Sequence, residues 1–300
     1  MYAIDTLYEA VAERGHVCVG LDTAVEYVPP GERRKAAAQV LDAPAAARAV
    51  LAFNRAIIEA TADICACFKV QIAYYEELGL AGLEAYAQTL ACLRKRGALV
   101  IADIKRGDIA DTALRYAKAH FSGDFEADFV TLSPYMGMDS IEPWLSYADD
   151  RGKGAFVLMR TSNKGMRDFE YQELAAGGRL YDAVGDRLAE LAAGRRGKYG
   201  YGAFGAVVGC TEREEAAAIR EKRGNLFFLI PGYGAQGGAA EDAALLLKEG
   251  NGGVVNASRS ILRAWAAGGT APADADNRFA AEAARKAALE MRDAIRAAAG

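Results

Sequence analysis

Eight short apolar runs recur along the chain, separated by Ala-rich segments with helical periodicity. Each run is nearly continuous in Val, Ile, Leu, Phe or Cys, which is typical of strands buried on both faces of a parallel sheet. Strict alternation of eight strands with helices predicts an α/β fold, a closed (β/α)8 or TIM barrel; an open, doubly wound sheet is the alternative. The runs are His16–Asp22, Ile64–Gln71, Leu99–Lys105, Phe129–Pro134, Ala155–Ser162, Ala206–Cys210, Leu226–Pro231 and Gly253–Arg259.

The spacers include predicted helices at Ala46–Ala62 and Asp242–Lys248. Two extra helices, at Asp5–Arg14 and Asn277–Ala299, are expected to bracket the barrel. No linker, low-complexity tract or charge run divides the chain. Because barrels of this kind often reach 300 residues, we expect one domain over residues 1–300.

Charge and hydropathy exclude several classes of protein. A net charge of −4 and a pI near 5.5 argue against a general nucleic-acid binder or a membrane-surface protein. The first twenty residues lack the basic and apolar regions of a signal peptide, and no stretch approaches the roughly 18–20 apolar residues of a membrane helix. A cytoplasmic protein is therefore expected.

Cysteine and histidine usage narrows the chemistry. Four of the five cysteines lie in apolar, strand-like runs, which favours reduced structural thiols. With two histidines in the whole chain, a His-rich metal site is excluded and no metal is expected. Acid–base chemistry must therefore fall mainly to Lys, Asp, Glu or Tyr.

Polar residues gather where the predicted strands end. They are Asp22, Lys69, Asp103, Lys105, Ser162, Gln236 and Arg259. Barrel enzymes carry their active sites at the carboxyl ends of the strands, so this distribution predicts a catalytic site there.

The segment Val100–Thr112, VIADIKRGDIADT, is the most informative. Asp103 and Lys105 lie two apart on a strand, so both side chains should enter the barrel mouth, and Asp108 follows in the loop. A solvated charge cluster at a strand end is the alternative. Apolar residues precede the motif and Lys69 ends another strand, and burying such charges is costly unless each is compensated. We therefore expect the array to be used.

The segment Leu226–Gly238, LFFLIPGYGAQGG, contains G-x-G-x-x-G. A dinucleotide-binding fingerprint would belong to the first βα unit and would require an acidic residue about twenty positions later, which is absent here. A barrel phosphate site after strands seven and eight fits better, with glycine amides, Gln236 and Arg259 as donors. In TSNKG, at Thr161–Gly165, Ser162 and Asn163 suit hydrogen bonding to a neutral polar group, such as a pyrimidine amide edge, although Ser and Asn also form turns.

Taken together, these motifs resemble those of the orotidine 5'-phosphate decarboxylase family, in its longer bacterial branch. The family signature is D-x-K-x-x-D-[IV]-[GP]-x-T, and it is matched by Asp103, Lys105, Asp108, Ile109 and Thr112. The resemblance extends to GLD at Gly20–Asp22, FKVQ at Phe68–Gln71, PGYGAQGG at Pro231–Gly238 and SRS at Ser258–Ser260.

The resemblance implies cofactor-free decarboxylation of orotidine 5'-phosphate to uridine 5'-monophosphate in pyrimidine biosynthesis. Lys105 would protonate C6 within a charged array that also holds Asp103, Lys69 and Asp108. The implied substrate-binding residues are Asp22, Ile109, Thr112, Ser162, Pro231, Gln236, Gly237 and Arg259. A homodimer is expected, in which Asp108, Ile109 and Thr112 reach the neighbouring subunit's site.

The sequence departs from the family pattern at three positions, Ala110, Asp111 and Lys164, which affects the expected loop geometry but removes no catalytic charge. Two alternatives stay open. One is a Mg2+-dependent sugar-phosphate lyase or synthase of the same barrel group, and the other is a barrel that binds a nucleotide without catalysis.

Overall fold

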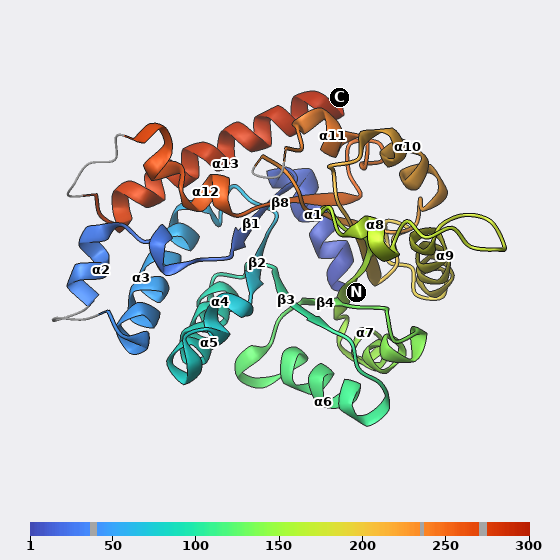
Figure 1. Ribbon diagram of the computed structural model, residues 1–300, viewed down its shortest axis with the longest axis horizontal. Coiled ribbons are helices and arrows are strands. Elements are labelled where there is room, and N and C mark those ends of the chain that lie inside the picture. The colour runs from blue at the N-terminus through green and yellow to red at the C-terminus, as the bar shows by residue number, and fades with distance from the viewer. Residues whose placement is uncertain (37–40, 235–236, 270–274) are drawn as a thin grey trace.

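The computed structural model describes residues 1–36, 41–234, 237–269 and 275–300. Eight parallel strands close into a barrel in sequence order, with β8 paired to β1 (Figure 1). The strands are β1 Val17–Leu21, β2 Cys67–Gln71, β3 Val100–Arg106, β4 Phe129–Leu132, β5 Gly154–Arg160, β6 Phe204–Val208, β7 Phe228–Ile230 and β8 Gly253–Ala257.

Helices surround this barrel (Figure 1). They are α1 Ala3–Arg14, α2 Pro30–Ala36, α3 Ala43–Thr61, α4 Ala73–Glu76, α5 Gly79–Lys95, α6 Ala110–Phe121, α7 Leu145–Arg151, α8 Met166–Phe169, α9 Leu180–Ala193, α10 Arg213–Lys222, α11 Ala240–Ala244, α12 Arg259–Leu262 and α13 Asn277–Ala299. The expected closed barrel is confirmed, because each predicted run overlaps a strand and β8 pairs with β1.

The helix predicted at Asp242–Lys248 is shorter than expected. The structure has α11 at Ala240–Ala244, and the chain then turns. Lys248 pairs with Asn251 across a tight turn whose two central residues, Glu249 and Gly250, have φ angles of 50° and 71°. Because positive φ is incompatible with a right-handed helix, the chain leaves the helical path before entering β8.

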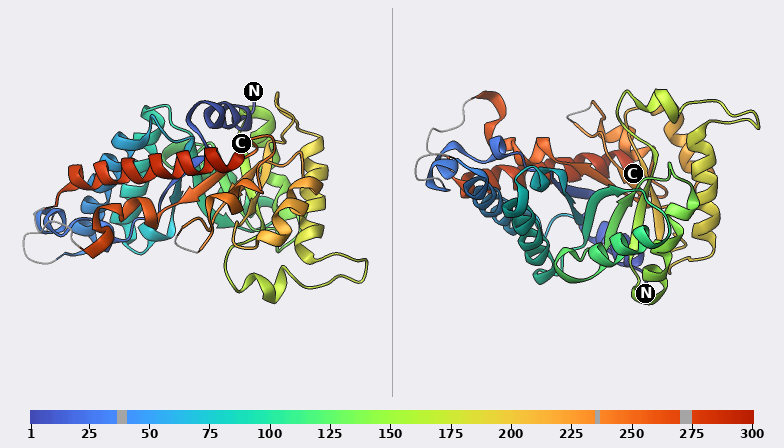
Figure 2. Two further views of the ribbon diagram at one scale, coloured as in Figure 1. Left: turned by 90° about the horizontal axis from the view of Figure 1, so that it is seen from above. Right: turned by 60° about the horizontal axis from the view of Figure 1, so that its bottom comes forward.

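The bracketing helices form where the sequence predicted them. The α1 helix lies across the amino-terminal end of the barrel (Figures 1 and 2), where Ile4, Leu7 and Val11 are buried in the same cluster as the inward side chains of the strands. The α13 helix packs against α3. The Asp276 carboxylate caps α13 by accepting from the Phe279 amide at 2.8 Å, an arrangement that stabilises a helix start.

The barrel interior is layered. Near α1 the inward side chains are apolar, and Phe129 and Phe156 are fully buried there. Alternate residues of a strand share a face, so the next inward layer lies two residues further along. That layer is partly polar and includes Lys69, Asp103 and Thr131. The apolar layer therefore supports a polar one beneath the mouth.

Gly20 leaves the space that this polar layer needs. A Cβ atom at Gly20 would lie 2.0 Å from Ser258 Oγ and 2.9 Å from Asn256 Oδ1. Any larger residue would displace both side chains, which belong to the cavity described next.

Candidate active site

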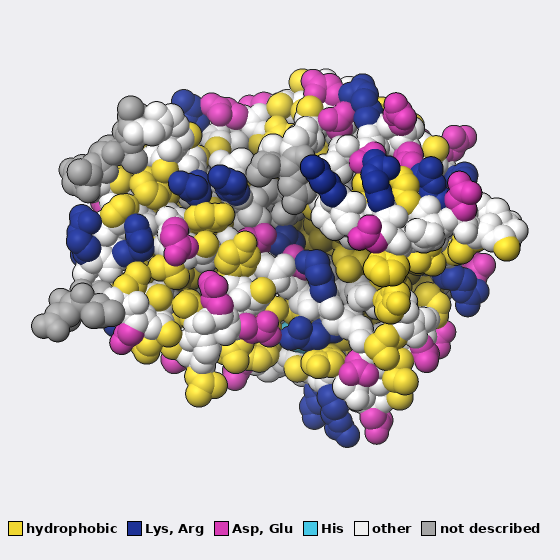
Figure 3. Space-filling view, viewed as in Figure 1, with side chains coloured by type: hydrophobic (Ala, Val, Ile, Leu, Met, Phe, Trp, Pro, Cys, Tyr) yellow, Lys and Arg dark blue, Asp and Glu magenta, His cyan; other side chains and the backbone are white. Residues whose placement is uncertain are grey.

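A cavity of about 510 Å3 opens at the carboxyl ends of the strands. Figure 3 shows this face hollowed near its centre, with basic and acidic side chains around the hollow. Every strand, or the segment directly after it, contributes to the lining. The lining residues are Asp22, Tyr27, Lys69, Gln71, Tyr74, Asp103, Lys105, Thr131, Leu158, Thr161, Ser162, Asn163, Val207, Leu229, Pro231, Gly232, Tyr233, Asn256, Ala257, Ser258, Arg259 and Ser260.

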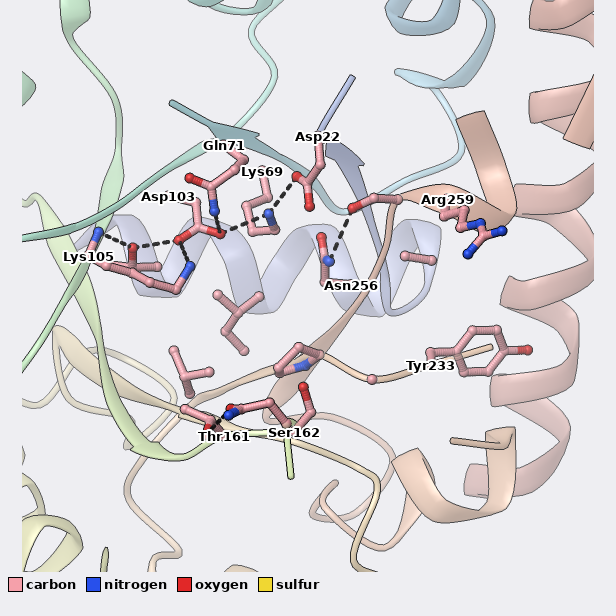
Figure 4. A pocket seen from close by; sticks show the side chains of 18 of the residues that line it. Asp22, Lys69, Gln71, Asp103, Lys105, Thr161, Ser162, Tyr233, Asn256 and Arg259 are labelled. Atoms are coloured by element: carbon pink, nitrogen blue, oxygen red, sulfur yellow. Dashed lines mark hydrogen bonds and ion pairs between the residues drawn. The ribbon is translucent and has the colours of Figure 1, made fainter. Parts of the chain in front are cut away.

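Four charged side chains form a continuous array along one side of the cavity (Figure 4). Lys69 Nζ lies 2.7 Å from Asp22 Oδ1 and 2.9 Å from Asp103 Oδ2. Lys105 Nζ lies 2.6 Å from Asp103 Oδ1. The signs alternate along the array, so each buried charge has an opposite neighbour. Side-chain exposure is 6% at Lys69 and Asp103, 22% at Asp22 and 48% at Lys105, so the two ends of the array are more accessible than its middle and Lys105 is the most exposed member.

The Asp103 carboxylate accepts four hydrogen bonds. Oδ1 accepts from Lys105 Nζ at 2.6 Å and from Thr131 Oγ1 at 2.8 Å. Oδ2 accepts from Lys69 Nζ and from Gln71 Nε2, each at 2.9 Å. An ionised carboxylate offers about four lone-pair sites, so these bonds occupy all of them.

Burial and charge oppose each other in this array. Burial alone would raise the pKa of Asp103, but Lys69 and Lys105 outweigh it and hold that pKa well below its usual range. Burial likewise opposes the charge on Lys69, yet the carboxylates of Asp103 and Asp22 raise the pKa of Lys69 above its ordinary value. Both groups therefore stay charged near neutral pH.

Lys105 reaches Asp103 through a local distortion of β3. Its φ angle is +44°, and the register with β4 shifts between Ala102 and Arg106. Thr131 Oγ1 accepts the amides of Ile104 at 3.0 Å and Lys105 at 2.9 Å, which satisfies donors that the shift removes from the ladder. A left-handed φ costs a non-glycine residue roughly 1–2 kcal/mol. Asp103 and Lys105 both face the cavity, as expected, but the distortion of β3 and not regular strand alternation brings them there.

The opposite side of the cavity is suited to an anion. Arg259 and Tyr233 lie across from Lys105 (Figure 4). Within the described part of the chain, Arg259 forms no ion pair with a carboxylate. Pro231 lines the cavity as expected, whereas Gly237 does not, and Gln236 lies outside the described residues.

Apolar and neutral polar groups lie between these charged sides. Leu158, Val207 and Leu229 line the cavity from three neighbouring strands, and Ser162 and Asn163 line it after β5. An apolar surface beside hydroxyl and amide groups suits a flat heterocycle with a polar edge.

The structure does not bring Asp108 into the array of its own chain. Asp108 Oδ1 accepts from the Ile109 amide at 2.8 Å, and neither residue lines the cavity. Ile109 is 40% exposed, and Thr112 is exposed at the start of α6. Ala110, where the resembled family has Gly or Pro, adopts a φ of +49°, so alanine occupies a conformation that glycine adopts more readily.

Three polar residues that line the cavity from within strands were given no role in the sequence analysis: Gln71, Thr131 and Asn256. Each stands within or directly after an apolar strand, which is the signal that could have found them. Gln71 lies two residues after Lys69 on the same strand face, and Thr131 interrupts Phe129–Leu132. A polar residue in a buried strand requires a partner, and here the partner of both is Asp103.

Other features bear on the excluded classes. All five cysteines are free thiols, and all but Cys92 are buried. Burial raises the pKa of the Cys210 thiol to about 11, which disfavours a reactive thiolate. The described residues contain no group of three or more His, Cys, Asp or Glu side chains placed to hold a metal. No described helix is long and apolar enough to cross a membrane.

Comparisons with known proteins agree with this geometry. The sequence model described as the orotidine 5'-phosphate decarboxylase / HUMPS family matches residues 15–271. An orotidine 5'-phosphate decarboxylase of Clostridium perfringens is 56% identical over 292 residues, covering 97% of both chains. The solved Leishmania donovani OMP decarboxylase is 32% identical with a TM-score of 0.72, covering 98% of this chain and 100% of that chain. Leishmania donovani UMP synthase is 33% identical with a TM-score of 0.75; the match covers 99% of this chain and 57% of that longer chain.

Proposed function

The chain belongs to the orotidine 5'-phosphate decarboxylase / HUMPS family, and from this we infer that it is a carboxy-lyase of pyrimidine biosynthesis. Its substrate would be orotidine 5'-phosphate, and its products uridine 5'-monophosphate and carbon dioxide. The observation that carries the proposal is the compensated array, which ends in the accessible ammonium of Lys105.

The proposed chemistry centres on C6 of the pyrimidine. Breaking the bond from C6 to the carboxylate carbon releases carbon dioxide and leaves the electron pair on C6, in the plane of the ring. A fixed ammonium can stabilise that charge as it develops. Lys105 then transfers a proton to C6. Asp103, with all its lone pairs engaged, would hold Lys105 in place and lie beside the substrate carboxylate as a fixed negative charge.

The remaining roles follow the position of each residue in the cavity. Lys69 and Asp22 would contact the ribose, and Ser162 would face the pyrimidine amide. The phosphate would lie on the Arg259 side, where a guanidinium offers a planar pair of donors. Pro231, Gln236 and Gly237 are proposed to complete that phosphate site.

Remote binding energy is essential to this proposal. Barrier lowering of about 20 kcal/mol lies within the range that enzymes reach, and one lysine cannot supply it alone. The phosphate side and the array lie at opposite sides of the cavity (Figure 4), so binding the phosphate would orient C6 against Lys105. We propose that no cofactor takes part.

The family description joins orotidine 5'-phosphate decarboxylase with HUMPS, so the family match alone does not exclude the sugar-phosphate alternative. The relatives at 50–56% identity are orotidine 5'-phosphate decarboxylases, which favours the nucleotide reaction. We further propose that residues 1–300 act as one domain and that the enzyme is cytoplasmic. The free thiols support this location.

The decisive experiment follows the loss of orotidine 5'-phosphate absorbance in EDTA, with no cofactor added. Wild type should turn over, and Lys105→Ala should lower kcat by at least about 10⁴-fold, because it removes both the proton donor and the stabilising charge. Lys164→Ala, an exposed lysine outside the cavity lining, is the matched control and should behave as wild type. Inactive wild type that acts on a sugar phosphate once Mg2+ is added would assign the lyase reaction instead.

We also propose a homodimer in which Asp108, Ile109 and Thr112 complete the partner's site. Their position outside their own cavity supports this, as do the exposed apolar side chains of Ile109 and Leu114 at the start of α6, 40% and 41% exposed.

Mixing two inactive variants tests this arrangement. If Lys105→Ala and Asp108→Asn are each inactive, subunit exchange should restore about a quarter of wild-type activity. Half of the dimers would then be hybrids, each with one intact site. A mixture no more active than its components, from chains shown to exchange, would place Asp108 in its own chain's site or outside catalysis.

A further inference from the structure

Arg160, the last residue of β5, is fully buried, and the proposed reaction gives it no role. Its Nη2 donates to the Gly209 carbonyl, whereas Nε and Nη1 have no hydrogen-bond partner among the described residues. No carboxylate of those residues lies within ion-pair distance of Arg160. Burying a cation with so few partners is costly to the fold.

A second buried arginine shows how a purely structural cation is accommodated. Arg220, on α10, donates to four backbone carbonyls, those of Arg223, Leu226, Leu246 and Gly252. Its guanidinium carbon also lies 3.8 Å from the centre of the Phe228 ring. Arg160 has one carbonyl where Arg220 has four, so stability alone does not account for Arg160.

The surroundings of Arg160 connect it to the cavity. The Gly209 amide donates back to the Arg160 carbonyl at 2.8 Å, so the two residues are joined in both directions. Gly209 lies directly against Ser162, because a Cβ atom on Gly209 would come within 2.7 Å of Ser162 Cβ. The position of Gly209 therefore limits where Ser162 can lie.

Thr161, the residue between Arg160 and Ser162, is held by a different side chain. Glu170 accepts the Thr161 amide at 2.8 Å and the Thr161 hydroxyl at 2.7 Å. Glu170 belongs to the segment between β5 and α9, which projects from the barrel in Figure 2. Thr161 and Ser162 are thus fixed between Glu170 on one side and the Arg160–Gly209 pair on the other.

We propose that Arg160 is a positioning residue that holds Gly209 against Ser162 and so sets how the site recognises the pyrimidine edge. This inference rests on the proposed function for its substrate. The proposal predicts that Arg160 affects substrate binding through Ser162 and does not itself contact the substrate.

A double-mutant cycle on orotidine 5'-phosphate turnover tests this. Arg160→Met should lower kcat/KM by about 10- to 100-fold, mainly through KM, because a small displacement of a substrate-positioning group can cost that much. Ser162→Ala should have a similar effect alone but add less than about twofold to Arg160→Met. Arg160→Lys should recover part of the loss. Arg220→Met, the control, should lower the Tm and leave KM unchanged.

Hydrogen exchange provides a measurement that needs no substrate. The peptide containing Val208–Cys210 should exchange faster in Arg160→Met but not in Arg220→Met. Independent effects of Arg160 and Ser162 in the cycle, or unchanged exchange at Gly209, would overturn the positioning role. If Arg160→Met does not fold, Arg160→Lys and Arg160→Gln replace it in both measurements. Inactive wild type with the expected exchange pattern would refute the proposed function and leave the contact intact.

Discussion

The same eight strands bury apolar side chains at one end of the barrel and charged side chains at the other. At the amino-terminal end, α1 covers an apolar layer in which Leu7, Phe129 and Phe156 are fully buried. At the carboxyl end, the same strands carry Lys69 and Asp103 into a cavity, where they are buried as charges. One end maximises apolar burial, and the other accepts the cost of desolvated charge.

This difference shows that stability and chemistry are separated along the barrel axis. At the closed end, α1 covers the barrel with apolar side chains, among them Ile4, Leu7 and Val11. The open end stays uncovered, as it would have to if the proposed substrate is to reach Lys105. The apolar layer lies two residues before the array along the same strands, and its burial offsets the desolvation cost of the buried charges. Substitutions at the two ends should therefore affect different measured quantities.

After the loss of Lys105, the largest expected effect lies at the open end, on the phosphate side. Arg259→Ala should lower kcat/KM by about 10²- to 10⁴-fold, because it removes a charge-assisted pair of donors from the phosphate. Arg259 is exposed, so the free energy of unfolding should stay within about 0.5 kcal/mol of wild type. Arg263→Ala, four residues further along and outside the cavity lining, is the matched control. Near-normal turnover by a folded Arg259→Ala would break the comparison.

The closed end should show the reverse pattern. Leu7→Ala should lower the free energy of unfolding by about 2–5 kcal/mol, through lost burial and a cavity beneath the barrel. Denaturant unfolding measures this, and kcat/KM of the remaining folded enzyme should stay within about twofold. Leu80→Ala, at an 87% exposed leucine, is the control and should change stability little. A large loss of kcat/KM in Leu7→Ala would show that the two ends are coupled.

Lowering the pH should destabilise the fold through a buried histidine while leaving the charged array intact. Burial, with a smaller contribution from Arg106, lowers the pKa of His120 from 6.5 to about 4. The unfolded chain then binds more protons than the folded one between these values. Stability should therefore fall as pH drops from 6.5 to 4, by up to about 3 kcal/mol from this residue. The depressed pKa of Asp103 makes its own contribution fully present above pH about 4, so the array should survive this window.

His120→Phe tests the acid prediction, with unfolding measured at several pH values. The slope of stability against pH should become shallower, while His16, whose pKa burial also lowers, contributes part of what remains. An unchanged slope would show that His120 is not a source of acid sensitivity.

The fold could be predicted from sequence because its signal is repeated eight times along the chain. The array was predictable where one strand carries it, as with Asp103 and Lys105. The roles of Thr131 and Gln71 depend on which strands become neighbours and on their register, which a single sequence does not state. The positive φ of Lys105 likewise arises from the shifted register between β3 and β4. The shortened helix after Ala244 reflects the Glu249–Gly250 turn, a local backbone preference that an apolar pattern does not show.

The saturation of Asp103 determines where hydrogen isotopes should travel. With four donors around it and a depressed pKa, Asp103 can neither carry nor relay a proton. The hydrogen delivered to carbon would then come from Lys105, whose side chain is 48% exposed and can exchange with solvent between turnovers. In heavy water, each product molecule should carry one deuterium at C6. In a mixture of light and heavy water, the deuterium content at C6 would reflect the isotopic composition of the Lys105 ammonium group alone.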